Sequence, residues 1–166
     1  MIPFTLGVKL LAIIENGSMP ALEIRDAADD DLPGVLRVLA ESGIDGGQSF
    51  TLDEARAQVA RLRMTPGYRL LAALTDGEVV GTYALIVIGK LGKRGRPSAV
   101  VEDVAVAPAR QGQGIGRAMM EHALGECRKA GCYKLALSSN TKRGDAHRFY
   151  ESLGFERHGY SFAVFQ

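Results

Sequence analysis

The sequence lacks tryptophan, has only two cysteines and carries almost no net charge, with 20 Lys and Arg residues against 19 Asp and Glu residues. Two cysteines are too few for the disulfide framework of a small secreted domain. Cys127 and Cys132 also lack C-x-x-C spacing, so we interpret both as reduced thiols of a cytoplasmic protein. The basic residues form no dominant run, which argues against nucleic acid as a partner.

The sequence also lacks an apolar run long enough to cross a bilayer. Residues 1–14 are apolar but contain Lys9, and no small-residue cleavage site follows them. We therefore predict no membrane partner and no signal peptide, and we divide the chain into a leader at residues 1–18 and one domain at residues 19–166. Apolar residues alternate with others from Ile2 to Leu10, which predicts an extra strand within the leader.

Histidine is scarce as well, and this bears on metal binding. None of His122, His147 and His158 has partners at the spacing typical of metal ligands, so we predict no metal site. His147 is close in sequence to other candidate site residues. We interpret it as a surface residue, because on a helix it lies away from the apolar stripe.

Hydrophobic periodicity, turn residues and helix caps predict an ordered series of elements. Asp76-Gly77 is typical of a tight hairpin, and Thr51 with Glu54 is typical of a helix-capping box. A strand, helix and strand of the observed lengths should bring the strands at 98–107 and 133–139 together in parallel. The expected elements are strands at residues 21–26, 68–75, 78–88, 98–107, 133–139, 156–160 and 162–165, and helices at residues 33–42, 52–65, 115–130 and 144–153.

Residues 104–124 hold the most informative pattern: a buried strand, a glycine-rich turn and a helix that starts at about Ile115. Gly112, Gly114 and Gly116 remove side chains where the backbone turns, so amide N–H groups can point outward at the positive end of the helix dipole. Such a turn favours an anion, and a phosphate in particular. It matches neither the dinucleotide fingerprint nor the P-loop.

The turn resembles the acetyl-CoA signature of the GCN5-related N-acetyltransferase (GNAT) family, Q/R-x-x-G-x-G/A, at Gln111, Gly114 and Gly116. A second segment similar to the family, H-R-F-Y-E-S-L-G-F, spans residues 147–155. The resemblance implies an α+β fold with a mixed, mostly antiparallel sheet, a splayed parallel strand pair and about four helices. It also implies an acetyl-CoA-dependent N-acetyltransferase that transfers acetyl to a primary amine by direct attack in a ternary complex.

The resemblance also implies roles for particular residues. Tyr150 matches the tyrosine that protonates the departing thiolate, and backbone N–H groups of residues 102–106 polarise the thioester oxygen. Many relatives have asparagine where this chain has Arg143, and Asn140 is the candidate to replace it. The cofactor-binding residues implied in this way are Val104, Ala105, Val106, Arg110, Gln111, Gly112, Gln113, Gly114, Ile115, Gly116, Arg117, Asn140 and Tyr150.

Glu102 is our candidate for the catalytic base, acting directly or through water, with Asp103 as the second candidate. A structural hydrogen bond or a solvated charge is the alternative for each. Adjacent side chains of a regular strand point to opposite faces, so only one of the two carboxylates can face the acetyl site. A β-bulge at this point would change that expectation.

Two loops have open roles. The resemblance implies that residues 42–50, between two helices, line the acceptor site and set acceptor specificity; the alternative is an ordinary surface connection. Residues 89–97 carry Lys90, Lys93, Arg94 and Arg96, which either attract an anionic acceptor or CoA phosphate or are simply solvated. The identity of the acceptor stays open at this point.

The whole chain has two alternatives to acetyl transfer, an idle acyl-CoA-binding regulatory module and an acyltransferase for a longer acyl group. We also expect a homodimer.

Overall fold

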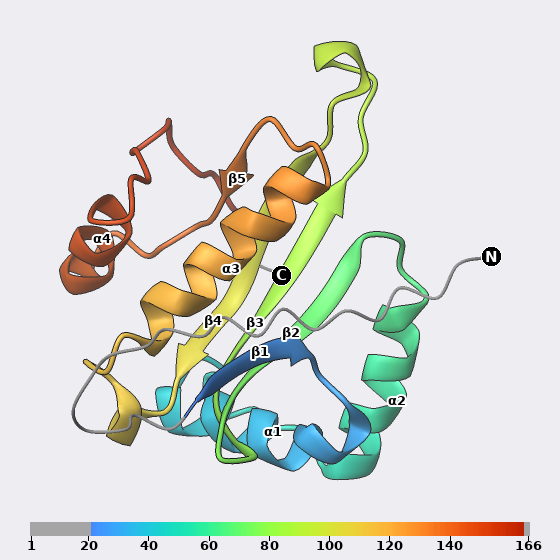
Figure 1. The fold of residues 1–166 in the computed structure, drawn as a ribbon, viewed down its shortest axis with the longest axis vertical. Coiled ribbons are helices and arrows are strands. Elements are labelled where there is room, and N and C mark those ends of the chain that lie inside the picture. Colours follow the sequence, from blue (N-terminus) through green and yellow to red (C-terminus); the bar gives the residue numbers. More distant parts are fainter. Residues whose placement is uncertain (1–20, 165–166) are drawn as a thin grey trace.

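A single mixed β-sheet forms the centre of the molecule (Figure 1). The computed structural model describes residues 21–164, and in this part of the chain five strands lie in the order β1-β2-β3-β4-β5. Neighbouring strands are antiparallel except for β4 and β5, which are parallel. With four α-helices in the same residues, the predicted α+β fold is confirmed. The elements are β1 (Leu22–Asp26), η1 (Asp29–Asp31), α1 (Leu32–Ser42), α2 (Leu52–Arg63), β2 (Tyr68–Thr75), β3 (Glu78–Ile88), η2 (Lys93–Gly95), β4 (Ser98–Val106), η3 (Pro108–Arg110), α3 (Ile115–Lys129), β5 (Leu135–Ala136) and α4 (Gly144–Glu151).

Helices cover both faces of this sheet, so each face has its own apolar cluster. Leu71 packs in one cluster with Met119 of α3, whereas the next residue, Ala72, packs in the other cluster with Val38 of α1. This alternation is the two-residue period of a strand that is buried on both sides. Figure 1 shows α3 lying along the sheet and α1 and α2 on its other side.

Two structures predicted from short sequence patterns are present: the hairpin turn at Asp76-Gly77 and the capping box of Thr51 and Glu54. Asp76 and Gly77 have φ values of 51° and 79°, as a tight hairpin turn between β2 and β3 requires. At the start of α2, Thr51 N donates to Glu54 Oε2 at 2.8 Å, and Glu54 N donates to Thr51 Oγ1 at 3.4 Å. Both structures depend only on residues close together in the sequence, so they could be predicted before the fold was known.

A β-bulge interrupts β4 at the position of the two adjacent carboxylates. Between the pair Ala84–Glu102 and the pair Thr82–Ala105, β4 has one residue more than β3. Asp103 lies in this bulge with φ of 53°, an uncommon conformation that aspartate tolerates better than most residues. The bulge changes the strict alternation of faces that a regular strand would impose on these carboxylates.

The parallel strand β5 is much shorter than predicted. Only Leu135 and Ala136 pair with β4, opposite Ala99 and Val100, whereas a strand over residues 133–139 was expected. The two strands have no further pairing after this point among the described residues. The edge of β4 from the bulge to Val106 is therefore left open by β5, as the expected splayed pair requires.

The last predicted strand pair, at residues 156–160 and 162–165, is wrong for the described part, because residues 156–164 contain no strand. Tyr160, Phe162 and Val164 alternate as in a strand but are 93%, 92% and 86% exposed. Alternation predicts an apolar face, but a strand also needs a neighbouring edge to pair with. The strand predicted in the leader lies outside the described residues.

Candidate active site

The glycine loop, residues 111–116, joins the end of β4 and the short helix η3 to α3. Gly112 and Gly114 have φ values of 76° and 81°, a left-handed conformation that costs other residues about 1–2 kcal/mol. Gly114 is the N-cap of α3, and the helix begins at Ile115 as predicted. The glycines thus let the chain turn sharply into the helix.

The turn leaves a row of amides unpaired. The amides of residues 112–117 have no backbone acceptor within the described part of the chain. The first amide of α3 with such a bond is that of Ala118, which donates to Gly114 O at 3.0 Å. Open N–H groups at the positive end of a helix dipole bind anions, so this loop fits the pyrophosphate of a CoA molecule.

Gly116 holds the loop close to two neighbouring elements. A Cβ atom at this position would lie 3.3 Å from Phe149 Cζ of α4 and 3.8 Å from Val106 Cγ2 of β4. The side chain of Gln111 reaches the same strand, where its Nε2 donates to Val106 O at 3.3 Å. The glycine loop is therefore tied to the end of β4 and to α4.

The open edge of β4 offers further N–H groups. Ala107 N donates to a carbonyl of β3 at 2.9 Å, and amides along a strand point alternately to its two edges. The N–H groups of Val104 and Val106 therefore face the edge that β5 leaves open, whereas that of Ala105 faces β3. Of the three strand residues named from the sequence, Val104 and Val106 can thus donate a backbone N–H to a ligand. The N–H of Ala105 points toward β3 instead.

Tyr150 lies on α4 in an aromatic cluster. Its ring packs edge-on against Phe149, with centroids 5.2 Å apart, and against Phe155, with centroids 5.8 Å apart. Burial raises the pKa of its hydroxyl, so Tyr150 holds its proton at neutral pH. A held proton is what a general acid needs.

Three polar residues follow β5 in the chain: Ser139, Asn140 and, in α4, His147. Asn140 Oδ1 accepts from Lys142 N at 2.9 Å, and the Asn140 carbonyl lies 2.9 Å from His147 Nε2. His147 is half-buried, and its ring is held by this hydrogen bond at the surface. Ser139 Oγ is buried and has no hydrogen-bond partner within the described residues. A polar group of a ligand could form that missing hydrogen bond.

Asp103 lines a pocket of about 310 Å³, and Glu102 precedes it in β4. Burial and the neighbouring charge of Asp103 raise the pKa of Glu102 above its ordinary value. The rest of the lining comes from α1 and from residues 44–50, the loop expected to set acceptor specificity. Sequence reasoning named that loop but none of its residues, because only the fold brings the loop to the bulge.

The model of the acetyltransferase (GNAT) family matches residues 35–155, a stretch that includes the glycine loop, the bulge and α4. The chain belongs to the GNAT family. It is 30% identical over 146 residues to glucosamine 6-phosphate N-acetyltransferase of Trypanosoma brucei brucei, covering 82% of this chain and 90% of that one. It is 32% identical over 147 residues to aminoalkylphosphonate N-acetyltransferase of Salmonella typhimurium, covering 87% and 91%. The solved structure of a protein from Agrobacterium tumefaciens str. C58 has a TM-score of 0.81 and 32% identity, covering 87% of this chain and 99% of that one.

Family membership makes this chain an acyltransferase of the EC 2.3.1 type that transfers acetyl to amines. The family uses acetyl-CoA as co-substrate, and the glycine loop fits that molecule by its open amides. The alternatives, an idle binding module or a longer acyl group, are not favoured, since the curated relatives are N-acetyltransferases.

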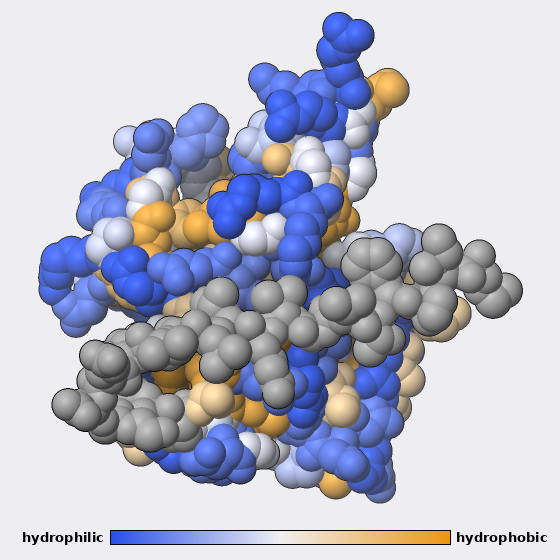
Figure 2. All heavy atoms as spheres, in the orientation of Figure 1, coloured by the Kyte–Doolittle hydropathy of each residue, from blue (hydrophilic) through white to orange (hydrophobic). Residues whose placement is uncertain are grey.

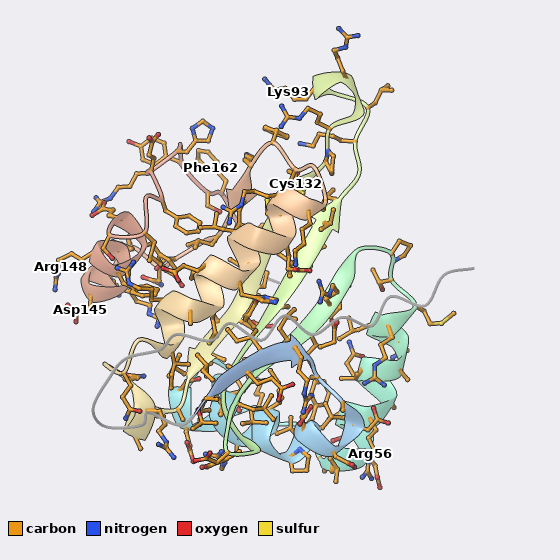
Figure 3. All side chains as sticks on the ribbon, viewed as in Figure 1. Arg56, Lys93, Cys132, Asp145, Arg148 and Phe162 are labelled. Carbon is orange, nitrogen blue, oxygen red and sulfur yellow. The ribbon has the colours of Figure 1, made fainter. Side chains whose placement is uncertain are left out.

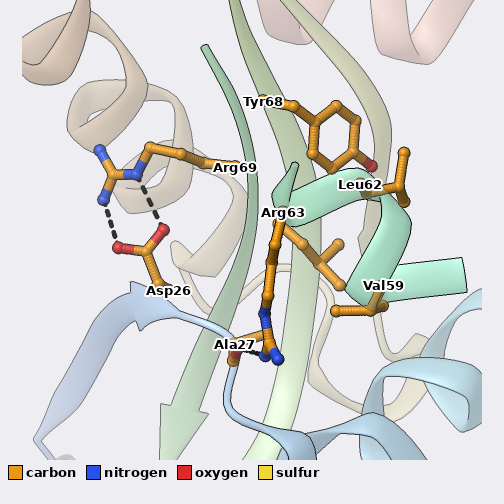
Figure 4. Close-up of a pocket in the computed structure, with 8 residues that line it drawn as sticks. Asp26, Ala27, Val59, Leu62, Arg63, Tyr68 and Arg69 are labelled. Carbon is orange, nitrogen blue, oxygen red and sulfur yellow. Dashed lines mark hydrogen bonds and ion pairs between the residues drawn. The ribbon is translucent and has the colours of Figure 1, made fainter. Parts of the chain in front are cut away.

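The GNAT chain has a second pocket, of about 240 Å³, between α2 and β2 (Figure 4). Both arginines in its lining already donate hydrogen bonds to other residues of the protein. Arg69 Nε donates to Asp26 Oδ1 at 2.8 Å, and Arg63 Nη2 donates to Ala27 O at 3.0 Å. No residue of the glycine loop lines this pocket.

The basic loop between β3 and β4 lies at the opposite end of α3 from the glycine loop (Figures 1 and 3). Lys90 Nζ donates to the Tyr133 hydroxyl at 3.0 Å, and Lys93 Nζ lies 5.9 Å from the centre of the same ring. The surface over this loop is mainly hydrophilic (Figure 2). Its distance from the glycine loop favours the solvated reading over a role at the pyrophosphate.

Within residues 21–164, no cluster of three His, Cys, Asp or Glu side chains is arranged to hold a metal ion. In the same residues, no helix combines the length and the apolar character needed to span a membrane.

Proposed function

We propose that this GNAT protein transfers the acetyl group of acetyl-CoA to the primary amine of a small molecule or peptide, by direct attack in a ternary complex. The observation that carries the proposal is the row of open amides at the start of α3, beside the open edge of β4. Holding two reactants in line supplies much of the rate in such a transfer, so few strongly catalytic side chains are needed.

In this proposal, the glycine loop and its neighbours bind the cofactor, and β4 polarises the thioester. The N–H groups of Val104 and Val106 donate to the thioester oxygen, where negative charge develops. Asn140 supplies a polar contact at the end of β5. The pyrophosphate is bound by the amides and side chains of Arg110, Gln111, Gly112, Gln113, Gly114, Ile115, Gly116 and Arg117.

The chemical step needs one acid and one base. The neutral amine nitrogen attacks the thioester carbon, the C–S bond breaks, and its electron pair stays on sulfur. Tyr150 gives its proton to that sulfur, and Glu102, directly or through water, takes the proton that the new amide nitrogen releases. Exchange with solvent restores both side chains. Asp103 is the second candidate for the base, because it lines the adjacent pocket.

Two measurements test this proposal together. Calorimetry should detect binding of acetyl-CoA to the free protein, and a thiol assay should detect CoA release when an amine library is added. Acetyl-CoA binding without thiol release for any amine would refute acetyl transfer while leaving the cofactor site in place.

We further propose that the enzyme acts as a homodimer in the cytoplasm and needs no metal. The exposed side chains of Tyr160, Phe162 and Val164 support a second copy as their cover. Cys127 and Cys132 are both free thiols, as a reducing compartment favours. Positioning and hydrogen bonds supply the chemistry proposed above, so it requires no metal ion.

A further inference from the structure

The pocket beside the bulge of β4 has a lining that constrains the acceptor. Eight residues line its volume of about 310 Å³, and they come from α1, the following loop and β4. Half of them are apolar, and Phe50 is 51% exposed on this surface. The lining residues are Leu36, Leu39, Ile44, Asp45, Gln48, Ser49, Phe50 and Asp103.

Within the part of the chain that the structure describes, the ionisable side chains in this lining are two carboxylates, Asp45 and Asp103. The Asp45 carboxylate accepts from the Ser49 hydroxyl and, at 2.9 Å, from Gly47 N, and these hydrogen bonds lower its pKa below the ordinary value. Asp45 is therefore ionised at neutral pH. Among residues 21–164, no lysine, arginine or histidine lines this pocket to pair with an anionic acceptor group.

The arginines on the two neighbouring helices are held by other partners. On α1, Arg37 Nη2 donates to Val79 O at 2.7 Å and to Glu78 Oε1 at 3.1 Å. On α2, Arg63 Nη1 donates to Asp29 Oδ1 at 2.7 Å, at the second pocket. Arg56 and Arg61 of α2 bond within that helix, to Asp53 and Gln58. None of these four guanidinium groups lines the pocket beside the bulge.

The N-terminus of α2 follows Phe50 directly and would otherwise be the natural place for a phosphate. It already carries negative charge, because Asp53 and Glu54 lie in the first turn. Thr51 N and Thr51 Oγ1 both donate to the Glu54 carboxylate, at 2.8 and 2.7 Å. A second anion at this helix end would be repelled by these carboxylates.

We propose that the acceptor is a diamine or polyamine: a primary amine with a second cationic group on an apolar body, and with no phosphate or phosphonate. The second cation pairs with the carboxylates of Asp45 and Asp103 while the reacting amine is neutral. This inference rests on the proposed acetyl transfer. It sets this chain apart from its two relatives named for glucosamine 6-phosphate and aminoalkylphosphonate, whose acceptors carry anions.

Two matched pairs of amines test the proposal with the full-length protein. The first pair, 1,4-diaminobutane and butylamine, differs in the second charge, and the second pair, glucosamine and glucosamine 6-phosphate, differs in the phosphate. We expect kcat/KM to be about tenfold or more higher for the diamine and for the unphosphorylated sugar. Added NaCl should raise KM for the diamine and leave that for butylamine unchanged.

One variant locates the charge effect. Asp45→Asn should raise KM for the diamine by about tenfold and leave KM for butylamine nearly unchanged. Asp30→Asn, which removes an exposed carboxylate of η1 outside the pocket, is the matched control and should change neither.

The outcomes separate this inference from the function on which it rests. Preference for butylamine over the diamine, or for glucosamine 6-phosphate over glucosamine, overturns the inference while acetyl transfer stands. Equal effects of Asp45→Asn on both amines of the first pair also overturn it. No thiol release with any of these four amines also overturns the inference, whereas no release across the whole amine library, despite acetyl-CoA binding, refutes the transfer itself.

Discussion

At the scale of single residues, the hydroxyl of Tyr150 is the sharpest test of the mechanism. Tyr150→Phe keeps the ring contacts with Phe149 and Phe155 but removes the proton donor. We expect kcat to fall roughly a hundredfold at nearly unchanged KM for acetyl-CoA, with the melting temperature retained. Tyr133→Phe, at the other end of α3, is the control and should retain full turnover. A kcat within twofold of the parent, with chemistry rate-limiting, would contradict the assignment.

If Glu102 is the catalytic base, its ionisation sets how kcat/KM depends on pH. A base works when ionised, so kcat/KM should rise with pH through its pKa. Burial and the charge of Asp103 raise that pKa, so the midpoint should lie above the ordinary glutamate value of 4.5. Asp103→Asn removes the neighbouring charge and should move the midpoint to lower pH. The measurement is kcat/KM against pH at a constant concentration of neutral amine, and an acid limb retained in Glu102→Gln would rule Glu102 out.

At the scale of elements, the glycine loop and α3 act as one anion site. Gly114→Asp places a carboxylate at the N-cap of α3, where the cofactor phosphates are proposed to bind, and should weaken acetyl-CoA binding roughly tenfold or more. Gly131→Asp is the matched control, since Gly131 also has positive φ and an open environment, at the other end of α3. Calorimetry on both variants makes the comparison. Equal losses in the two would mean that backbone strain, not charge at the loop, causes the effect.

The junction of β1 and η1 depends on the buried carboxylate of Asp31. Burial acts to raise its pKa, but the hydrogen bonds from Arg25 Nη2, at 3.1 Å, and Ala28 N, at 2.7 Å, together with the Arg25 charge, lower it below 3.8. Its contribution to stability is therefore complete above pH 3.8 and is lost as the pH falls through the folded-state pKa.

Asp31→Asn should accordingly lower the free energy of unfolding by about 1–3 kcal/mol at pH 7. The difference from the parent should shrink as the pH drops below 3.8. Urea denaturation at neutral and acidic pH measures both values, and Asp30→Asn in the same short helix is the control. A difference that grows toward acid would show that the pKa of Asp31 is raised instead.

At the scale of the whole molecule, the exposed C-terminal segment predicts association. Replacing Tyr160, Phe162 and Val164 together with serine should convert a dimer to a monomer in light scattering, because these side chains are 86% exposed or more. Met64→Ser removes a side chain that is 83% exposed elsewhere, and it should leave the mass unchanged. An unchanged mass in the triple variant would mean that this segment is not the interface.

The family, the order of the main elements and the glycine loop were all predictable from the sequence, because they depend on short-range chemistry. Glycine at positive φ before Ile115, the Thr51 and Glu54 capping box and the Asp76-Gly77 turn each involve a few neighbouring residues. Hydrophobic alternation likewise marks a strand without reference to its partner.

Only the tertiary structure decided what depends on pairing between distant segments. The bulge at Asp103 is a feature of the register of β4 against β3, and the short β5 is a feature of its pairing with β4 at Ala99 and Val100 alone. The acceptor-side pocket needs α1, a loop and β4 to meet, so no local pattern could bring Asp45 to Asp103. The strands predicted at residues 156–160 and 162–165 did not form in the described part of the chain, because a strand needs an edge to pair with and the local sequence does not contain that edge.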